Sequence, residues 1–440
     1  MITLYSPSGT SKRLDYIMSH LCNNILGTEF LITSDRSYFL EQTGPSINYS
    51  NTALCRGIQI VPSGLLFETG IHSIREWNES EWKGLFCFFY TGKGDIPFDL
   101  LAASFYLLSL YEEYLSAEPD AHGRFKHTDS FLFRKGLLET PIIDRWAYLL
   151  KEEFAKAGFD LSDFQLRKYR AIHTYDIDFP YLYRHKGLIK NIFGTFRDLA
   201  NQNMRGVKNR ILALFRFRKD PYKAAIEAID QFQTQLRRPY YLFVLLGEKG
   251  KYGRTTLYPT PRYYRYLKSL KRAQIGLHPS YNALNHSKQL VKEKSQLEKI
   301  LGKPVYLSRR HFLRMQVPQT FRETYAAGFS EDFTLAFSHA PGFRSGTAIP
   351  HLFYDLQKEE SLALLIRPSI AMDSTFIFHL QSSPEEALQK LKRLADACKQ
   401  SGGDYLTIWH NSNLAFEGTE NPWTTVFIRS TRYAVELEKS

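Results

Sequence analysis

A run of apolar and β-forming residues ends abruptly at two acidic side chains in the segment 172–180. Asp176 and Asp178 stand two positions apart, and Pro180 follows them. Because proline is excluded from strand interiors, we expect a strand to end and a loop to begin here. Side chains two residues apart on a strand point to the same side, so the two carboxylates should project together. Polar residues at the ends of parallel strands carry the chemistry of α/β barrels.

Three histidines also follow short strand-like runs. They are His278 after 274–277, His311 after 305–307, and His410 after 405–409. Taken singly, a histidine after a strand is more often structural than functional, and an Asp-x-Asp pair recurs by chance. If the strands are parallel neighbours, however, all these side chains converge on one rim. Two close carboxylates favour a cation or a shared proton, so the pattern indicates a metal site.

Strand-like and helix-like stretches alternate through the second part of the chain. Further strand candidates are 240–246 and 364–367. A capping box at 383–386, with Pro384 at the first helical position, predicts a helix that ends before Gly402 and Gly403. The alternation favours a parallel sheet that is closed or partly closed into a barrel.

The first part of the chain has a different pattern and no catalytic constellation. Short β-like runs at 29–33 and 57–61 precede helical runs at 98–114 and 144–156. We therefore expect residues 1–160 to form a mixed α+β domain of unknown role. His122, Arg124 and His127 are more typical of a solvated loop than of a site. At 440 residues the chain exceeds what one core usually serves, which agrees with two domains.

Three segments resemble motifs of a known family. Residues 174–178 look like the first motif of the polysaccharide deacetylases, the NodB-homology group of carbohydrate esterase family 4, in its Asp-x-Asp variant. Residues 278–280 are similar to the opening of the second motif, and 408–410 to the closing Leu-x-His motif. The resemblance covers about 168–435, and the chain resembles a divergent bacterial branch with an extra N-terminal domain. It implies an α/β fold, an irregular (β/α) barrel of the NodB type.

The resemblance also implies a role for individual side chains. Asp176 would be the catalytic base, Asp178 and His278 metal ligands, and His410 the general acid. Arg344, within 342–347, would take the part of the arginine that orients the base, although the Pro-Tyr pair that follows it in the family is missing.

The third metal ligand is where the chain departs from the family. The usual second histidine stands four residues after the first, where this chain has Asn282. His311 ends the next strand and lies in a segment, 308–313, that is similar to the divergent branch, so His311 and Asn282 are the alternatives. With His311, a trio with Asp178 and His278 would hold a divalent ion, most simply Zn²⁺. Other aspartates near strand or loop boundaries could orient a ligand histidine but are more typical of caps: Asp332, Asp355 and Asp373.

Together these residues predict a metal-dependent deacetylase. It would hydrolyse the N-acetyl group of an amino sugar in a glycan or a lipid-linked glycan precursor, with Asp176 activating water and His410 protonating the leaving amine. The alternative is a catalytically inactive deacetylase-like protein that binds glycans or serves as a scaffold at the membrane surface. Asn282 is the main argument for the alternative, whereas retention of Asp176 and His410 argues against it.

Basic residues are concentrated in an insertion at 184–219. The chain has a net charge of +12, and this insertion carries ten Lys and Arg against a single Asp198. It also has apolar stripes, so a basic amphipathic helix lying on an anionic membrane surface is one interpretation. A helical excursion with a solvated basic face explains the pattern equally well. Nucleic-acid motifs are missing from the sequence, and we expect no nucleic-acid partner.

The amino terminus and the cysteines bear on location. Residues 1–9 show no basic region followed by an apolar one, and no stretch approaches the ~18 apolar residues of a membrane span. Four cysteines show no spacing typical of zinc sites or disulfides: Cys22, Cys55, Cys87 and Cys398. We expect a cytoplasmic protein, with peripheral contact to the inner face of the membrane if the first interpretation of 184–219 holds.

Overall fold

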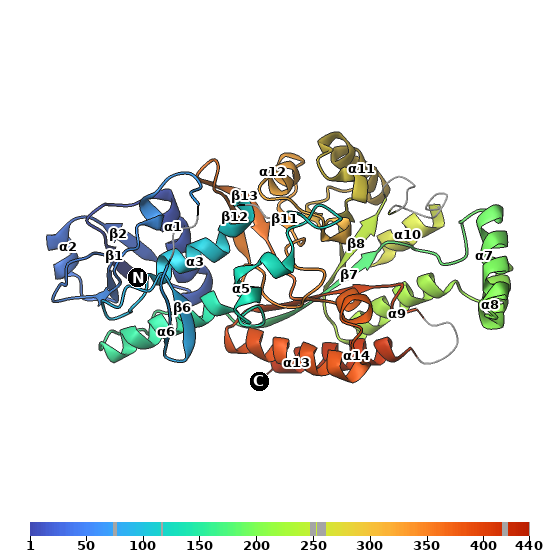
Figure 1. Ribbon diagram of the computed structural model, residues 1–440. Coiled ribbons are helices and arrows are strands. Elements are labelled where there is room, and N and C mark those ends of the chain that lie inside the picture. Colours follow the sequence, from blue (N-terminus) through green and yellow to red (C-terminus); the bar gives the residue numbers. More distant parts are fainter. Residues whose placement is uncertain (74–76, 116–117, 247–251, 253–260, 416–420, 440) are drawn as a thin grey trace.

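The computed structural model describes residues 1–73, 77–115, 118–246, 252, 261–415 and 421–439. Within these ranges the strands form a small sheet near the amino terminus, a large sheet in the middle and a two-stranded hairpin. Figure 1 shows the small sheet at one end of an elongated molecule and a pair of helices, α7 and α8, at the other end.

The small sheet is parallel, in the order β2–β1–β3–β4. Its strands are β1 (Ile2–Tyr5), β2 (Phe30–Thr33), β3 (Ser46–Asn48) and β4 (Ile58–Gln59). Intervening helical segments are α1 (Lys12–Met18), η1 (Ser19–Leu26) and α2 (Arg36–Glu41). The strands β5 (Glu79–Trp82) and β6 (Leu85–Phe88) form an antiparallel hairpin that is hydrogen-bonded to neither sheet in the described residues. The first part of the chain thus combines helices with a small parallel sheet and an antiparallel hairpin. That residues 1–160 form a separate domain stays a prediction.

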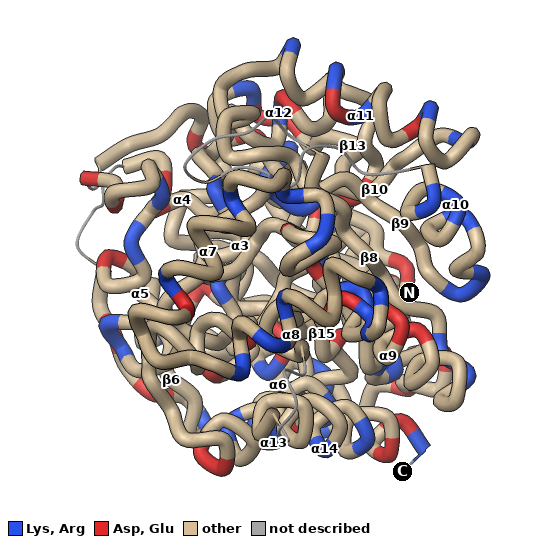
Figure 2. The backbone as a smooth tube through the Cα atoms, turned by 90° about the vertical axis from the view of Figure 1, so that its right-hand side faces the viewer, with Lys and Arg blue, Asp and Glu red and all other residues tan. Residues whose placement is uncertain are grey.

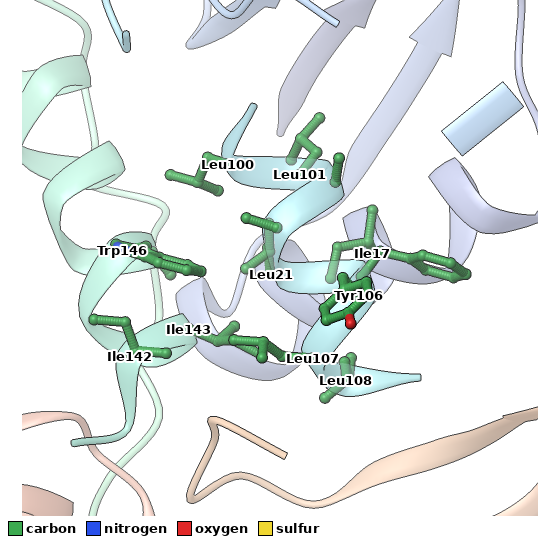
Figure 3. Close-up of a cluster of buried hydrophobic side chains, with 14 of the residues drawn as sticks. Ile17, Leu21, Leu100, Leu101, Tyr106, Leu107, Leu108, Ile142, Ile143 and Trp146 are labelled. Carbon is green, nitrogen blue, oxygen red and sulfur yellow. The ribbon is translucent and has the colours of Figure 1, made fainter. Parts of the chain in front are cut away.

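Helices from the first part of the chain pack together in a hydrophobic core beside this small sheet. The predicted runs at 98–114 and 144–156 are confirmed as α3 (Leu100–Leu108) with α4 (Tyr111–Tyr114), and as α6 (Ile142–Lys156). Every residue of α3 is buried, so it shows no amphipathic period. Figure 3 shows side chains of α3, among them Leu101 and Leu107, clustered with Ile17, Leu21 and Trp146.

The large sheet has the order β12–β13–β11–β10–β9–β8–β7–β15–β14. Its strands are β7 (Arg170–Ile177), β8 (Tyr240–Leu245), β9 (Ala273–His278), β10 (Leu307–Ser308), β11 (Glu331–Asp332), β12 (His351–Asp355), β13 (Glu360–Ile366), β14 (Ala371–Met372) and β15 (Asp404–His410). All neighbours are parallel except β12 and β13. The α/β sheet predicted from the sequence is confirmed, but hydrogen bonds between described residues leave it open, because β12 and β14 form its edges.

The antiparallel strands β12 and β13, at one edge of the large sheet, and the turn between them contact the first part of the chain. Tyr16 donates its hydroxyl to the carbonyl of Leu352 at 2.7 Å, and Nε of Arg13 lies 3.0 Å from Oε2 of Glu359. The two parts of the molecule are thus joined through the end of the sheet.

Helices surround the large sheet: α9 (Pro221–Gln235), α10 (Pro261–Ser269), α11 (Ser287–Leu301), α12 (Gln319–Ala326), α13 (Pro384–Gln400) and α14 (Pro422–Leu437). The predicted capping box is present at the start of α13, where Ser383 and Glu386 bond each other's backbone N–H groups. A membrane-spanning helix, long and apolar enough for that task, is not found among the described residues. The cytoplasmic location stays a prediction.

Register places the polar strand ends at matching levels. His410 pairs with Asp176 between β15 and β7. Ile177 pairs with Val244 of β8, and His278 pairs with Leu245, the next residue of β8. Asp178, which follows Ile177, is therefore at the level of Leu245 on one side of β8, and His278 is at the same level on the other side. Because all four strands run parallel, their carboxyl ends meet at one edge of the sheet.

Candidate metal centre and active site

Asp178, His278 and His311 lie together at this edge. One ligand atom from each side chain falls within 4.8 Å of the others. Nε2 of His278 is 3.2 Å from Oδ1 of Asp178, and Nε2 of His311 is 3.5 Å from Oδ2. The alternative third ligand, Asn282, is exposed on the short helix η4 (Tyr281–Ala283). Between the two alternatives, the structure brings His311 to the trio.

Hydrogen bonding fixes the tautomer of His278. Its Nδ1 lies 2.6 Å from the carbonyl oxygen of Arg309, which can only accept, so Nδ1 carries a hydrogen. In the neutral imidazole the Nε2 lone pair then faces Asp178. Both Nε2 of His278 and Oδ1 of Asp178 are buried without a hydrogen-bond partner in the described part of the chain. Two facing acceptors need a cation or a proton between them, which fits a metal site of carboxylate and imidazole ligands.

Neighbouring groups of opposite charge shift the pKa values of Asp178 and His278 in opposite directions. Burial alone would raise the pKa of Asp178, but the nearby imidazoles of His311, His278 and His410 hold it well below its usual value. Burial opposes the positive form of His278, but Asp176 and Asp178 outweigh it and raise the pKa of the imidazole. The trio is an anionic pocket that attracts positive charge.

Asp176 lies beside the trio and is buried. Its Oδ1 accepts a hydrogen bond from Nη1 of Arg309 at 2.9 Å. Its Oδ2 faces Nε2 of His278 at 3.8 Å and Nε2 of His410 at 4.0 Å. One carboxylate oxygen is therefore fixed and the other faces the centre of the site.

Arg309 is held in place on several sides. Nε donates to the carbonyl of Phe333 at 3.2 Å, and Nη2 lies 3.4 Å from Oγ of Ser369. The guanidinium carbon is 4.5 Å from the centre of the Phe243 ring. The sequence comparison of motifs gave Arg309 no role, although it stands two positions before His311 in the segment 308–313.

Arg344, expected to orient the base, bonds elsewhere. Its Nε and Nη2 donate to the carboxylate of Glu113 at 2.8 and 2.7 Å, and its Nη1 donates to the carbonyl of Ala336 at 2.8 Å. Glu113 belongs to α4, so this buried pair links the first part of the chain to the loops of the large sheet. The arginine that contacts Asp176 is Arg309.

His410 is oriented by an aspartate. Nδ1 of His410 lies 2.6 Å from Oδ1 of Asp373, and the backbone N–H of His410 donates to Oδ2 at 2.7 Å. Asn413 also donates to Oδ2 of Asp373, at 3.0 Å. The sequence interpretation of Asp373 as a cap or solvated residue was wrong on this point, because the carboxylate is buried.

The carboxylates around His410 favour its charged form. Burial lowers the pKa of the imidazole, but Asp373, followed by Asp178 and Asp176, raises it to about 10. Nε2 of His410 lies 3.9 Å from Oδ2 of Asp178. With Nδ1 committed to Asp373, the proton on Nε2 is the one that faces the site.

A cavity of about 450 Å³ opens onto these side chains. Apolar residues form part of its wall: Phe179, Phe312, Leu313, Met372 and Phe378. Phe378, with 61% of its surface exposed, offers its ring to solvent. Arg124, from the first part of the chain, also lines the cavity and donates to the carbonyl of Phe312 at 2.7 Å. The prediction of a solvated loop was wrong for Arg124, which is buried.

The backbone after His311 is strained. Phe312 and Leu313 have φ values of 62° and 50°, the left-handed region that bulky residues avoid at a cost of about 1–3 kcal/mol each. The conformation is held by hydrogen bonds from His311 N–H to the carbonyl of Pro279 and from Leu313 N–H to that of Arg310. This turn directs His311 into the trio and Phe312 into the cavity wall.

Comparisons with known proteins add the following findings. Residues 2–158 match a family described as "Family of unknown function (DUF7033)". No curated protein matches the chain. Asp176, Asp178, His278, His311 and His410 all lie outside the matched range.

Similar solved structures include two that are described as a putative and a probable polysaccharide deacetylase, and an allantoinase. A putative polysaccharide deacetylase from Mycobacterium smegmatis is 14% identical, with 60% of this chain and 82% of that chain covered and a TM-score of 0.36. Puue allantoinase is 13% identical, with 61% of this chain and 84% of that chain covered and a TM-score of 0.39. A probable polysaccharide deacetylase from Pseudomonas aeruginosa PAO1 is 12% identical, with 61% of this chain and 85% of that chain covered and a TM-score of 0.37. Function is therefore argued below from the geometry of the site.

Proposed function

We propose that the protein is a metal-dependent hydrolase that removes the acetyl group from an N-acetylated amino sugar. The supporting observation is the convergence of Asp176, Asp178, His278, His311 and His410 on one cavity, with facing acceptors on Asp178 and His278 that lack a protein donor. The resemblance of three motifs to the polysaccharide deacetylases supports the choice of reaction.

Asp178, His278 and His311 would hold the cation. A divalent ion bound there would supply Lewis-acid chemistry, polarising a carbonyl and acidifying water. Zn²⁺ suits two imidazoles and a carboxylate, and three protein ligands leave positions for substrate and water. The hydrogen bond from His278 Nδ1 to the Arg309 carbonyl orients the ring and leaves the lone pair of Nε2 to bind the cation.

Asp176 would act as the base and His410 as the acid. Oδ2 of Asp176, opposite the oxygen fixed by Arg309, takes a proton from the attacking water as oxygen adds to the amide carbon. Nε2 of His410 then gives its proton to the nitrogen as the carbon–nitrogen bond breaks. Acetate and a free amine leave, and Asp373 keeps the imidazole oriented through Nδ1.

The cavity wall suits an acetylated sugar. Phe312, Leu313 and Met372 provide an apolar lining that can receive an acetyl methyl group. The exposed ring of Phe378 can stack on the apolar face of a pyranose.

Acetate release from N-acetylated chito-oligosaccharides tests the proposal. We expect the Zn²⁺-loaded protein to release acetate and Asp176→Asn to lower kcat by about 10²–10⁴-fold. The matched control is Asp163→Asn, because Asp163 is an exposed aspartate away from the site. Binding of these sugars without acetate release, in a protein that retains zinc, would instead favour the non-catalytic glycan-binding alternative.

A further inference from the structure

The insertion at 184–219 forms a helical hairpin that stands apart from the sheet. Its helices are α7 (Leu188–Ala200) and α8 (Met204–Leu214), seen at the far edge of the molecule in Figure 1. The hairpin contributes no residue to the catalytic cavity. Its role is therefore a separate question from the proposed hydrolysis.

The contact between the two helices is polar. Asn191 and Asp198 are among the buried residues of α7, and Arg210 is buried on α8. Nη2 of Arg210 lies 2.6 Å from Oδ2 of Asp198, and Nη1 lies 3.3 Å from Oδ1 of Asn191. Gly194 permits this approach, because a Cβ there would lie 2.6 Å from Nη1 of Arg210.

The outer surface is apolar. The exposed fractions on α7 are Leu188 76%, Ile189 70%, Ile192 46%, Phe193 70%, Phe196 65% and Leu199 43%. Beyond α7 they are Met204 64%, Ile211 46%, Leu214 39%, Phe215 70% and Phe217 77%. At 3.6 residues per turn, the six residues of α7 occupy an arc of about 140°. A hairpin with a polar interior and an apolar exterior has the reverse of the pattern that water favours.

Positive charge accompanies the apolar arc. Ten Lys and Arg stand against one Asp in 184–219, a net charge of +9 of the chain's +12. Figure 2 shows basic residues on both helices where the hairpin faces the viewer. Lys190 and Arg197 fall beside the apolar arc at about 180–200° on the same helical projection. Long basic side chains at that border can reach anionic groups while their stems stay in apolar surroundings.

The base of the hairpin is fixed to the body of the protein. Asp220, at the start of α9, accepts backbone hydrogen bonds from Leu182, Tyr183 and Arg184, at 2.7, 2.9 and 3.0 Å. Nε of Arg184 donates to the carbonyl of Ala213 at 2.7 Å. The two ends of the insertion are thereby held together, and the hairpin is presented as a unit.

We propose that the α7–α8 hairpin docks the protein on an anionic lipid bilayer. The apolar arc would enter the boundary between headgroups and acyl chains, and the basic residues would contact anionic headgroups. Helices of 13 and 11 residues are too short to cross the hydrocarbon core, so they lie in the plane of the surface. A second copy of the chain is a poorer occupant, because two surfaces with the same excess of positive charge repel each other.

Flotation of the full chain with vesicles tests this inference. We expect binding to phosphatidylcholine vesicles that contain about one third phosphatidylglycerol, weaker binding to pure phosphatidylcholine, and loss of binding at high salt. Phe193→Glu together with Phe196→Glu should lower partitioning at least about tenfold. The matched control is Val291→Glu with Tyr306→Glu, two exposed apolar residues outside the hairpin with exposed fractions of 51% and 53%.

Two results would overturn the inference. One is flotation with neither kind of vesicle by folded wild-type protein. The other is a dimer that the Phe193→Glu, Phe196→Glu protein converts to monomer without any vesicle binding, since the hairpin would then cover a second copy. Circular dichroism of the variants establishes that they are folded, and this measurement depends neither on catalysis nor on metal binding.

Discussion

Arg309 and Asp176 form a buried ion pair, with Nη1 of the arginine 2.9 Å from Oδ1 of the aspartate. Arg309 follows β10, and two strands, β9 and β8, lie between β10 and β7, which bears Asp176. The pair determines which carboxylate oxygen is left for chemistry, because Oδ1 is engaged and Oδ2 faces His410. Positioning of this kind is a large part of what a general base needs.

Replacement of Arg309 should impair turnover more than replacement of Arg344. We expect Arg309→Lys to lower kcat by about 10–100-fold, because lysine cannot reproduce the planar array of donors that holds Asp176. Arg344→Lys should leave kcat within about threefold, since its partner is Glu113. Steady-state acetate release by zinc-loaded proteins measures both. The opposite order of effects would return Arg344 to the role of base-orienting residue.

Metal content should depend on His311 and not on Asn282. Elemental analysis of wild type after incubation with Zn²⁺ should give about one ion per chain, as expected of one trio of ligands. His311→Ala should lose most of it, because two ligands rarely hold zinc, whereas Asn282→Ala should keep it, because Asn282 is exposed. Equal loss in both variants, or metal in neither wild type nor variants, would contradict the proposed trio.

The strand ends were predictable because their sequence signals are local. A β-forming run that stops at a polar residue marks the end of a strand, and a proline adds to the signal after β7 and β9. These signals gave β7, β9 and β15 to within a few residues. Parallel packing then brings Asp176, Asp178, His278 and His410 together. His311, which lies three residues beyond β10, was one of two alternatives for the third ligand, and the strained turn that follows it at Phe312 is a conformation that no local rule predicts.

The supporting residues could not be predicted because their partners are distant in sequence. Asp373 contacts His410 across 37 positions, and Arg309 contacts Asp176 across 133. Nothing in the sequence near Arg344 indicates that Glu113, 231 positions away, takes its guanidinium. Apolar residues in 184–219 suggested packing or membrane contact equally, and only the exposed fractions show that they are not packed.

Arg344 and Glu113 should matter for stability. Both side chains are almost fully buried, at 2% and 4% exposed, and both arginine nitrogens of the pair are bonded. Glu113→Gln or Arg344→Met should each lower the free energy of unfolding by about 3–5 kcal/mol, because the remaining charge is buried without its partner. The double variant should lose less than the sum of the two. Urea unfolding followed by circular dichroism gives the three values, and strict additivity would show that the pair is not coupled.

Asp373→Asn should move the alkaline limit of activity to lower pH. Asp373 is the main group that raises the pKa of His410, which reaches about 10, and the proposed acid works only while Nε2 carries a proton. Activity is therefore present below the pKa of His410 and lost as the pH rises through it. A divalent ion beside Asp178 would lower this pKa in the loaded enzyme, but removal of Asp373 shifts it further in the same direction. A pH profile of kcat for both proteins should show the alkaline limb displaced by at least about one unit. Limbs that coincide would mean that a group other than His410 delivers the proton.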